Sequence, residues 1–147
     1  MTTDNKELVR KLYSEAWERG NLDFIYELYA EGVEIHMQGV PEDPFGPAPM
    51  VQLVSMARTA APGLRVTIDD LISEYDKVVA LITIHGGFQG QVSGAKPREN
   101  VSVWRRIDVY RFHNGLVVEQ WSDRNDITLL RDIGVGVPHV DQGLALE

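Results

Sequence analysis

The segment WRRIDVYR, residues 104–111, places an arginine and an aspartate two residues apart between aromatic neighbours. Side chains alternate across a β-strand, so a strand here puts Arg106 and Asp108 on the same face as Trp104 and Tyr110. A guanidinium beside a carboxylate holds it ionised and oriented, which suits proton abstraction or the activation of water. We predict that Asp108 is a base, that Arg106 is its orienting cation or an oxyanion stabiliser, and that Trp104 and Tyr110 line a pocket.

The same pair also has a purely structural interpretation. Ion pairs on the solvent-exposed face of a sheet are common and contribute little to stability. The aromatic residues that flank Arg106 and Asp108 on their face favour the pocket over the exposed ion pair.

Other polar residues are candidates for the same site. His36 can titrate near neutral pH and act as acid or base, although a lone histidine is more often structural. Asp123 is a catalytic candidate if a bulge turns it into the pocket mouth; its alternative role, shared with Asp126, is to cap a following helix. Strand alternation places Gln120 and Ser122 on the inward face, where they would line the pocket.

The segment GVPEDPFGPAP, residues 39–49, contains four prolines and two glycines and is predicted to be a stiff loop. We expect Phe45 to reach from this loop toward the pocket mouth as a hydrophobic gate. No group of histidines and carboxylates has the spacing typical of metal ligands, so no metal is expected.

Composition narrows the class of protein. The chain has 147 residues, the size of a single domain with one substantial core. Its 22 acidic and 14 basic residues give a net charge of −8, which argues against nucleic acid and anionic membranes as partners. The absence of cysteine excludes disulfides and thiolate chemistry. With no apolar leader and no run of ~20 apolar residues, a cytoplasmic location is expected.

Three helices are predicted before a sheet. Apolar residues at helical spacing predict a first helix over 8–17, a short second one from 22 to 29 that Gly32 stops, and a third over 50–60. A short strand, VEIHMQ, precedes the proline loop. Val, Ile and aromatic residues predict strands over 64–71, 78–88, 101–112 and 116–121, with an Asn114-Gly115 hairpin turn between the last two. This segregation is α+β, and a strongly bent sheet wrapped on helices would leave a conical cavity.

The segments LRVTIDDLISEYDKVVALITIHGGFQGQ and VWRRIDVYRFHNGLVVEQWSDRNDITLLRDIG resemble the SnoaL-like polyketide cyclase family of the nuclear-transport-factor-2-like superfamily. The resemblance covers nearly the whole chain to Gly134. It implies one domain over 1–134, a cone-shaped α+β barrel with three N-terminal helices on a bent, mainly antiparallel sheet, and an arm or flexible tail over 135–147.

The resemblance also implies an assembly. Members commonly form homodimers through the outer face of the sheet, and an apolar strand face is available here for such a contact. This face could equally be part of the core, because large apolar sheet faces are always covered by something. Its residues are Val101, Val103, Ile107 and Val109.

Characterised cyclases of this family close rings by intramolecular aldol condensation without a cofactor. They use an aspartate near the end of the last strand, assisted by a histidine and a glutamine on the preceding strand. The resemblance places that aspartate at Ser122, the histidine at Asp108 and the glutamine at Arg106, so all three positions differ in type. The Arg-x-Asp spacing also resembles that of limonene epoxide hydrolase, where the pair lies on a different strand.

We therefore predict a cofactor-independent enzyme that acts on an apolar, polycyclic or polyketide-like small molecule. Its reaction would be cyclase-like, or that of a related isomerase, lyase or epoxide hydrolase. Two alternatives stay open: a module that binds an apolar small molecule without converting it, since a fold does not imply chemistry, and a structural dimerisation domain with a filled cone.

Overall fold

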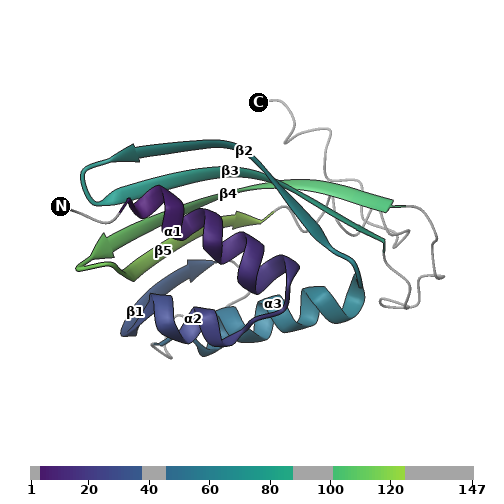
Figure 1. Ribbon diagram of the computed structural model, residues 1–147, viewed down its shortest axis with the longest axis horizontal. Helices are drawn as coiled ribbons and strands as arrows, with labels where there is room; N and C mark the ends of the chain where they lie inside the picture. Colours follow the sequence, from purple (N-terminus) through teal and green to yellow (C-terminus); the bar gives the residue numbers. More distant parts are fainter. Residues whose placement is uncertain (1–3, 38–45, 88–100, 125–147) are drawn as a thin grey trace, which may run out of the picture.

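Five strands form a single curled sheet, with the helices gathered against one of its faces (Figure 1). The computed structural model describes residues 4–37, 46–87 and 101–124. The strands are β1 (Tyr29–Met37), β2 (Arg65–Glu74), β3 (Lys77–Gly87), β4 (Val101–His113) and β5 (Leu116–Arg124), in the order β1-β5-β4-β3-β2. Successive strands from β2 to β5 pair antiparallel, whereas β1 pairs with β5 in parallel. The predicted α+β class with a mainly antiparallel sheet is confirmed.

The first helix begins at Asn5, three residues before the predicted range, and changes its winding halfway. Asp4 caps α1 (Asn5–Lys11) by accepting a hydrogen bond from the backbone N–H of Lys6 at 3.0 Å. The chain then continues as a π-helix, η1 (Leu12–Glu18). The helix α3 (Ala48–Ala60) packs against η1, and α1 and η1 contact β2. The two-part first helix is thus held between α3 and the sheet.

The second helix ends earlier than the sequence predicts. Its apolar spacing predicts a helix through Tyr29 that stops at Gly32, but α2 (Asp23–Leu28) ends before both. Tyr29 is already extended, with φ −92° and ψ 138°, and pairs with Val117 of β5. The prediction was wrong because a strand partner far along the chain overrides the local helical pattern.

The hairpin between β4 and β5 forms where the sequence predicts it. Asn114 and Gly115 both adopt positive φ, 53° and 81°, as a two-residue hairpin turn requires. On β2, the exposed residues Asp69 and Asp70 lie where the register with β3 shifts. Such a bulge bends the sheet.

The two faces of the sheet differ as strand alternation predicts. On β4, Arg106, Asp108 and Tyr110 are buried, whereas Val103 and Ile107 are 45% and 44% exposed. The concave face packs on the helices, whereas no described residue buries Val103 or Ile107 on the outer face. The buried apolar residues of the concave face and the helices include Leu12, Trp17, Ile25, Val54, Val78, Ala80, Ile82 and Ile84.

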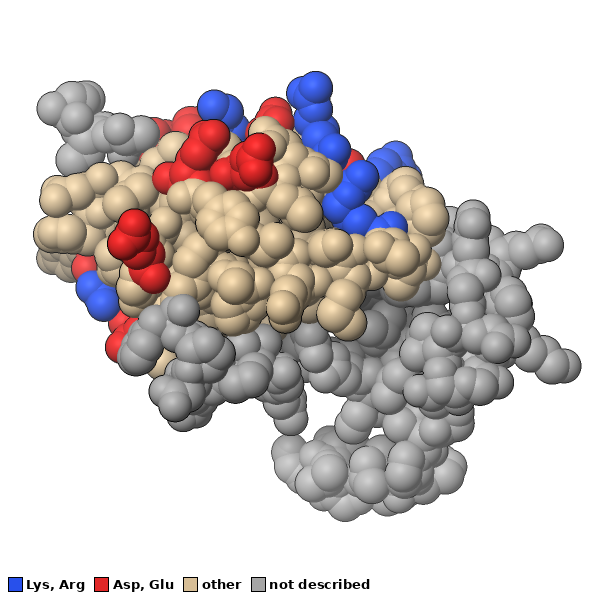
Figure 2. All heavy atoms as spheres, turned by 90° about the horizontal axis from the view of Figure 1, so that it is seen from below, with Lys and Arg blue, Asp and Glu red and all other residues tan. Residues whose placement is uncertain are grey.

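Several predicted features lie outside the described residues, namely residues 39–45 of the proline loop, including Phe45, the residue Asp126 and the tail over 135–147. The loop was predicted to extend to Pro49, but α3 already begins at Ala48. Within the described part of the chain, no helix is long and apolar enough to cross a membrane. Figure 2 shows one face of the molecule, on which basic and acidic side chains stand close to one another around a broad uncharged area.

Candidate functional site

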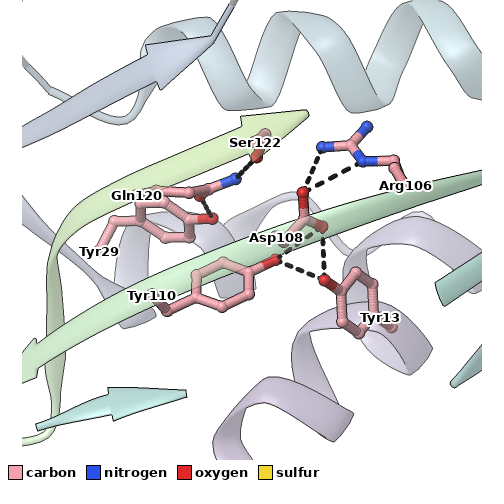
Figure 3. Close-up of polar contacts among 7 residues, drawn as sticks. All are labelled: Tyr13, Tyr29, Arg106, Asp108, Tyr110, Gln120 and Ser122. Carbon is pink, nitrogen blue, oxygen red and sulfur yellow. Dashed lines mark hydrogen bonds and ion pairs between the residues drawn. The ribbon is translucent and has the colours of Figure 1, made fainter. Parts of the chain in front are cut away.

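Two elements bring the candidate site together. Strand β4 turns Arg106, Asp108 and Tyr110 toward the helices, because alternate residues of a strand share a face. The π-helix η1 carries Tyr13 and Trp17, both 1% exposed, against that face. Short π-helical turns are rare in proteins, and those that occur are often found at functional sites. Figure 3 shows how the polar side chains of β4 and the Tyr13 hydroxyl converge.

Asp108 lies at the centre of this group and has no exposed surface. The Nε and Nη2 atoms of Arg106 donate to its Oδ1 at 3.2 and 2.9 Å. The Tyr13 hydroxyl donates to Oδ2 at 2.5 Å. Tyr110 shares its single proton between Oδ2 of Asp108, at 3.2 Å, and the Tyr13 oxygen, at 2.7 Å. Hydrogen-bond donors therefore face both carboxylate oxygens of Asp108.

Arg106 and Asp108 form an ion pair whose side chains are 2% and 0% exposed. The guanidinium carbon lies 5.1 Å from the centroid of the Trp17 ring, a cation–π contact. Burial by itself lowers the pKa of Arg106, but the charge of Asp108 and the nearby Tyr13 and Tyr110 outweigh it, so the pKa is raised. Arg106 is thus a permanent cation in a site that holds one matching negative charge.

The phenols around Asp108 are held in their protonated form. Burial, and after it the negative charge of Asp108, raises the pKa of Tyr13, Tyr29 and Tyr110 well above the ordinary value of 10.0. Each hydroxyl therefore acts as a hydrogen-bond donor at neutral pH.

A second polar group continues the site across β5. The Tyr29 hydroxyl donates to Oε1 of Gln120 at 2.5 Å, and Nε2 of Gln120 donates to Oγ of Ser122 at 2.8 Å (Figure 3). In the register of β4 and β5, Tyr110 stands opposite Gln120 and Asp108 opposite Ser122. Gln120 is buried and Ser122 is half-buried, and both lie beside the Asp108 group.

His36 is not brought to this group. It lies exposed on the opposite face of the sheet, between Ile35 and Met37, which are buried. Its Nε2 is 2.7 Å from Oε2 of Glu119, and its ring stacks on Trp121 with centroids 5.5 Å apart. His36, a candidate for the same site as Asp108, therefore lies on the other face of the sheet from it.

The outer-face group around His36 offers three possible metal-ligand atoms within 4.8 Å of one another among the described residues, from Glu34, His36 and Glu119. Glu119 already accepts from the Arg111 guanidinium at 2.9 Å and faces His36. Burial raises the pKa of Glu119, but the hydrogen bonds from Arg111 and His36 outweigh it, so the pKa is lowered. A guanidinium in contact with this carboxylate disfavours a cation at the same place.

The remaining predicted residues are only partly described. Trp104 and Asp123 belong to β4 and β5, but their side chains lie outside the described part, as does Phe45 entirely. Sequence reasoning missed Tyr13 and Tyr29 as site residues and used Trp17 only as part of the helical spacing of the first helix. One feature of the sequence could have indicated these residues. A tyrosine or tryptophan on a buried face carries a polar atom that needs a hydrogen-bond partner.

Comparisons with known proteins agree with this geometry. The model of the family described as SnoaL-like polyketide cyclase matches residues 7–133. The chain is similar to AclR from Streptomyces galilaeus, to which a hydroxylase activity has been ascribed, with 26% identity, a TM-score of 0.76 and coverage of 88% of this chain and 94% of that one.

Two further solved structures show the same fold at lower identity. One is IdmH from Streptomyces antibioticus, to which a polyketide cyclase activity has been ascribed. It is 22% identical, with a TM-score of 0.81, and the match covers 90% of this chain and 100% of IdmH. TsrD from Streptomyces laurentii is 21% identical, with a TM-score of 0.76 over 89% and 95% of the two chains. No curated protein matches. The predicted cone-shaped fold is confirmed.

Proposed function

Because the chain belongs to the SnoaL-like polyketide cyclase family, we propose that it is a cofactor-independent enzyme that acts on an apolar, polycyclic, polyketide-like molecule. The observation that carries this proposal is Asp108, a buried carboxylate on the concave face that is paired with Arg106 and ringed by phenols. The polyketide cyclase activity ascribed to the similar protein IdmH is consistent with such a site.

The proposed reaction begins with proton removal from a carbon next to a carbonyl. Asp108 takes the proton, the C–H bond breaks, and its electron pair forms the carbon–carbon double bond of an enolate, leaving the negative charge on oxygen. The enolate carbon then attacks a second carbonyl of the same molecule and closes the ring. Asp108 returns its proton to the new alkoxide, so the site ends in its starting state.

The ion pair suits this step electrostatically. Before the transfer, Arg106 balances the charge of Asp108; after it, Asp108 is neutral and the enolate carries the charge. The total charge of the buried site stays the same, so no uncompensated charge is created where desolvation makes it costly. A carboxylate without Arg106 would lack this balance.

One contact of Asp108 can open for the substrate without leaving a group unpaired. The Tyr110 contact at 3.2 Å is longer than the Tyr13 contact at 2.5 Å to the same oxygen. Tyr110 also has the 2.7 Å contact with the Tyr13 oxygen, so its proton can turn fully to Tyr13. The lone pair of Oδ2 that faces Tyr110 is then free to accept a substrate proton.

A second candidate, a binding or structural domain without catalysis, is favoured by one observation. Both oxygens of Asp108 have donors and the residue has no exposed surface, as in a polar network that only ties η1 to β4. Asp123 and Trp104 remain proposed contributors to the site mouth under either candidate.

We also propose that the chain forms a homodimer through the outer face of the sheet. Val103 and Ile107 on β4 and Ile72 on β2 are 45%, 44% and 51% exposed. In the sheet register, Ile107 stands opposite Leu81. Several apolar residues thus lie side by side on a face that water would otherwise cover, and a second copy would bury it.

Deuterium exchange tests the first step of the proposed chemistry, whatever product the later steps form. Polycyclic ketones with an acidic C–H next to a carbonyl are incubated with the protein in D2O, and the loss of the C–H signal is followed by NMR. The proposal expects exchange at one position that scales with protein concentration. Binding of the ketones without exchange would favour the non-catalytic candidate.

A further inference from the structure

The indole N–H of Trp17 stands out among the buried polar atoms. Trp17 is 1% exposed, and within the described residues its Nε1 is the buried side-chain nitrogen or oxygen that has no hydrogen-bond partner. Buried donors are almost always paired, because an unpaired one loses its water without compensation. The neighbouring buried hydroxyls of Tyr13 and Tyr110 are paired, so the Trp17 donor calls for an acceptor that is not part of the polypeptide described.

The position of this donor relates it to the proposed base. The Trp17 ring lies under the guanidinium of Arg106, 5.1 Å from centroid to carbon. Arg106 donates to Asp108 through Nε and Nη2, and no hydrogen bond joins its Nη1 to another described residue. Figure 3 shows one guanidinium nitrogen of Arg106 directed away from Asp108. Nε1 of Trp17 and Nη1 of Arg106 are therefore two neighbouring donors that make no hydrogen bond to the described residues.

The backbone that carries Trp17 is firmly held. Nη1 of Arg58, on α3, donates to the carbonyl oxygens of Trp17 and Glu18 at 2.9 and 2.6 Å. These contacts fix the end of η1, and the cation–π contact fixes the ring above it. A donor held in this way is pre-organised, which is what stabilisation of a developing charge requires.

Resting on the proposed function, we propose that the Trp17 N–H and Nη1 of Arg106 bind the substrate carbonyl oxygen and hold it as it becomes the enolate oxygen. A carbonyl oxygen is only two bonds from the acidic carbon beside it. Arg106 contacts both Asp108 and Trp17, so the base and the two donors belong to one small region, and the proposal places a single ketone against all three. The substrate is thus a ketone whose acidic carbon and carbonyl oxygen both enter the site.

A phenolate tests the oxygen site, because it is a stable mimic of an enolate. The probes are 4-nitrophenol, which ionises near neutral pH, and nitrobenzene, which lacks the phenolic oxygen. Wild type is expected to bind the phenolate together with a proton on Asp108, the charge state of the enolate complex. It should do so at least about 10-fold more tightly than it binds nitrobenzene, as expected for hydrogen bonds to a charged acceptor. Equal affinity for the two probes, or no phenolate binding, would overturn the proposal.

The decisive variant removes only the N–H. Trp17→Phe does so but leaves a cavity, so a second variant carries 3-benzothienylalanine at position 17, in which sulfur replaces the N–H within the same shape. Phenolate affinity should fall about 10-fold or more in this isostere, while nitrobenzene affinity stays unchanged. Unchanged phenolate affinity in the isostere would overturn the proposal.

A third arm separates this inference from the proposed function. Asp108→Asn keeps both donors and removes a nearby negative charge, so it should keep or strengthen phenolate binding while it loses deuterium exchange. If Asp108→Asn loses exchange but the isostere keeps its phenolate affinity, the proposed oxygen site is wrong and the role of Asp108 as base stands. If Asp108→Asn exchanges normally but the isostere binds the phenolate more weakly, the role of Asp108 as base is wrong and the oxygen site stands.

Discussion

Tyr13 and Asp108 are joined by a 2.5 Å hydrogen bond although 95 residues separate them in the chain. The contact ties the π-helix to the central strand β4 at a point that has no access to water. It also fixes which oxygen of Asp108 faces the phenols and which faces Arg106. The site therefore depends on the packing of η1 against the sheet as much as on β4 itself.

The first prediction concerns this bond. Tyr13→Phe removes the donor and leaves Oδ2 of Asp108 with Tyr110 alone, so the free energy of unfolding should fall by about 1–3 kcal/mol. Urea unfolding measures it. Tyr26→Phe is the matched control, because Tyr26 is 55% exposed, and it should change the value by less than about 0.5 kcal/mol. Equal effects of the two variants would contradict the network.

Alkaline pH should act through the same phenols. The raised pKa of Tyr13, Tyr29 and Tyr110 means that the folded state keeps protons that the unfolded chain releases above its ordinary value of 10.0. The stability that these groups contribute is therefore complete below pH 10 and is lost as the pH rises beyond it.

Phenolate absorbance and circular dichroism, followed together from neutral to alkaline pH, measure this effect. Ionisation of the three buried tyrosines should coincide with unfolding. If all five tyrosines of the chain ionise while the circular dichroism is still native, the buried phenols are not protected in the way described.

Much of β4 is predictable from sequence because one strand carries its own periodicity. Arg106, Asp108 and Tyr110 follow each other at every second position, and their shared buried face follows from the strand alone. Tyr13 and Tyr29 were missed because their partners lie 95 and 91 residues away. Periodicity gives the faces of an element but not its neighbours.

The position of His36 illustrates the same limit. Alternation in β1 shows that His36 and Ile35 face opposite sides, but only the parallel pairing with β5 decides which side is the concave one. That pairing joins His36 to Trp121 and Glu119 on the outer face. The buried Trp17 N–H is likewise invisible to any pattern of apolar residues.

Arg106 should not be replaceable by lysine. Arg106→Lys keeps the positive charge but loses the planar fork that donates twice to Asp108 and the flat contact with Trp17. We expect exchange activity to fall by about 10-fold or more. The control is Arg10→Lys in an exposed pair with Glu7, which should keep full activity. Full activity of Arg106→Lys would show that only the charge matters.

The dimer prediction is tested by placing a charge on the apolar outer face of the sheet. Ile107→Glu places a charge on the outer face, and light scattering should show a monomer where wild type at micromolar concentration is a dimer. Met56→Glu is the control, because Met56 is 69% exposed on α3, away from that face, and it should remain dimeric. A monomeric wild type would contradict the proposed assembly.

The role of Asp108 as base is tested by Asp108→Asn, which keeps the shape but cannot accept the substrate proton. Circular dichroism first verifies that the variant is folded, because the change leaves Arg106 without its counter-charge. Asp76→Asn provides a matched control, since Asp76 lies in an exposed pair with Lys77.

The measurement is the rate of deuterium exchange into a ketone that wild type turns over. Folded Asp108→Asn is expected to exchange at least about 100-fold more slowly than wild type, while Asp76→Asn exchanges at the wild-type rate. A folded Asp108→Asn protein that exchanges as fast as wild type would contradict the role of Asp108 as base and move the chemistry away from the Arg106–Asp108 pair.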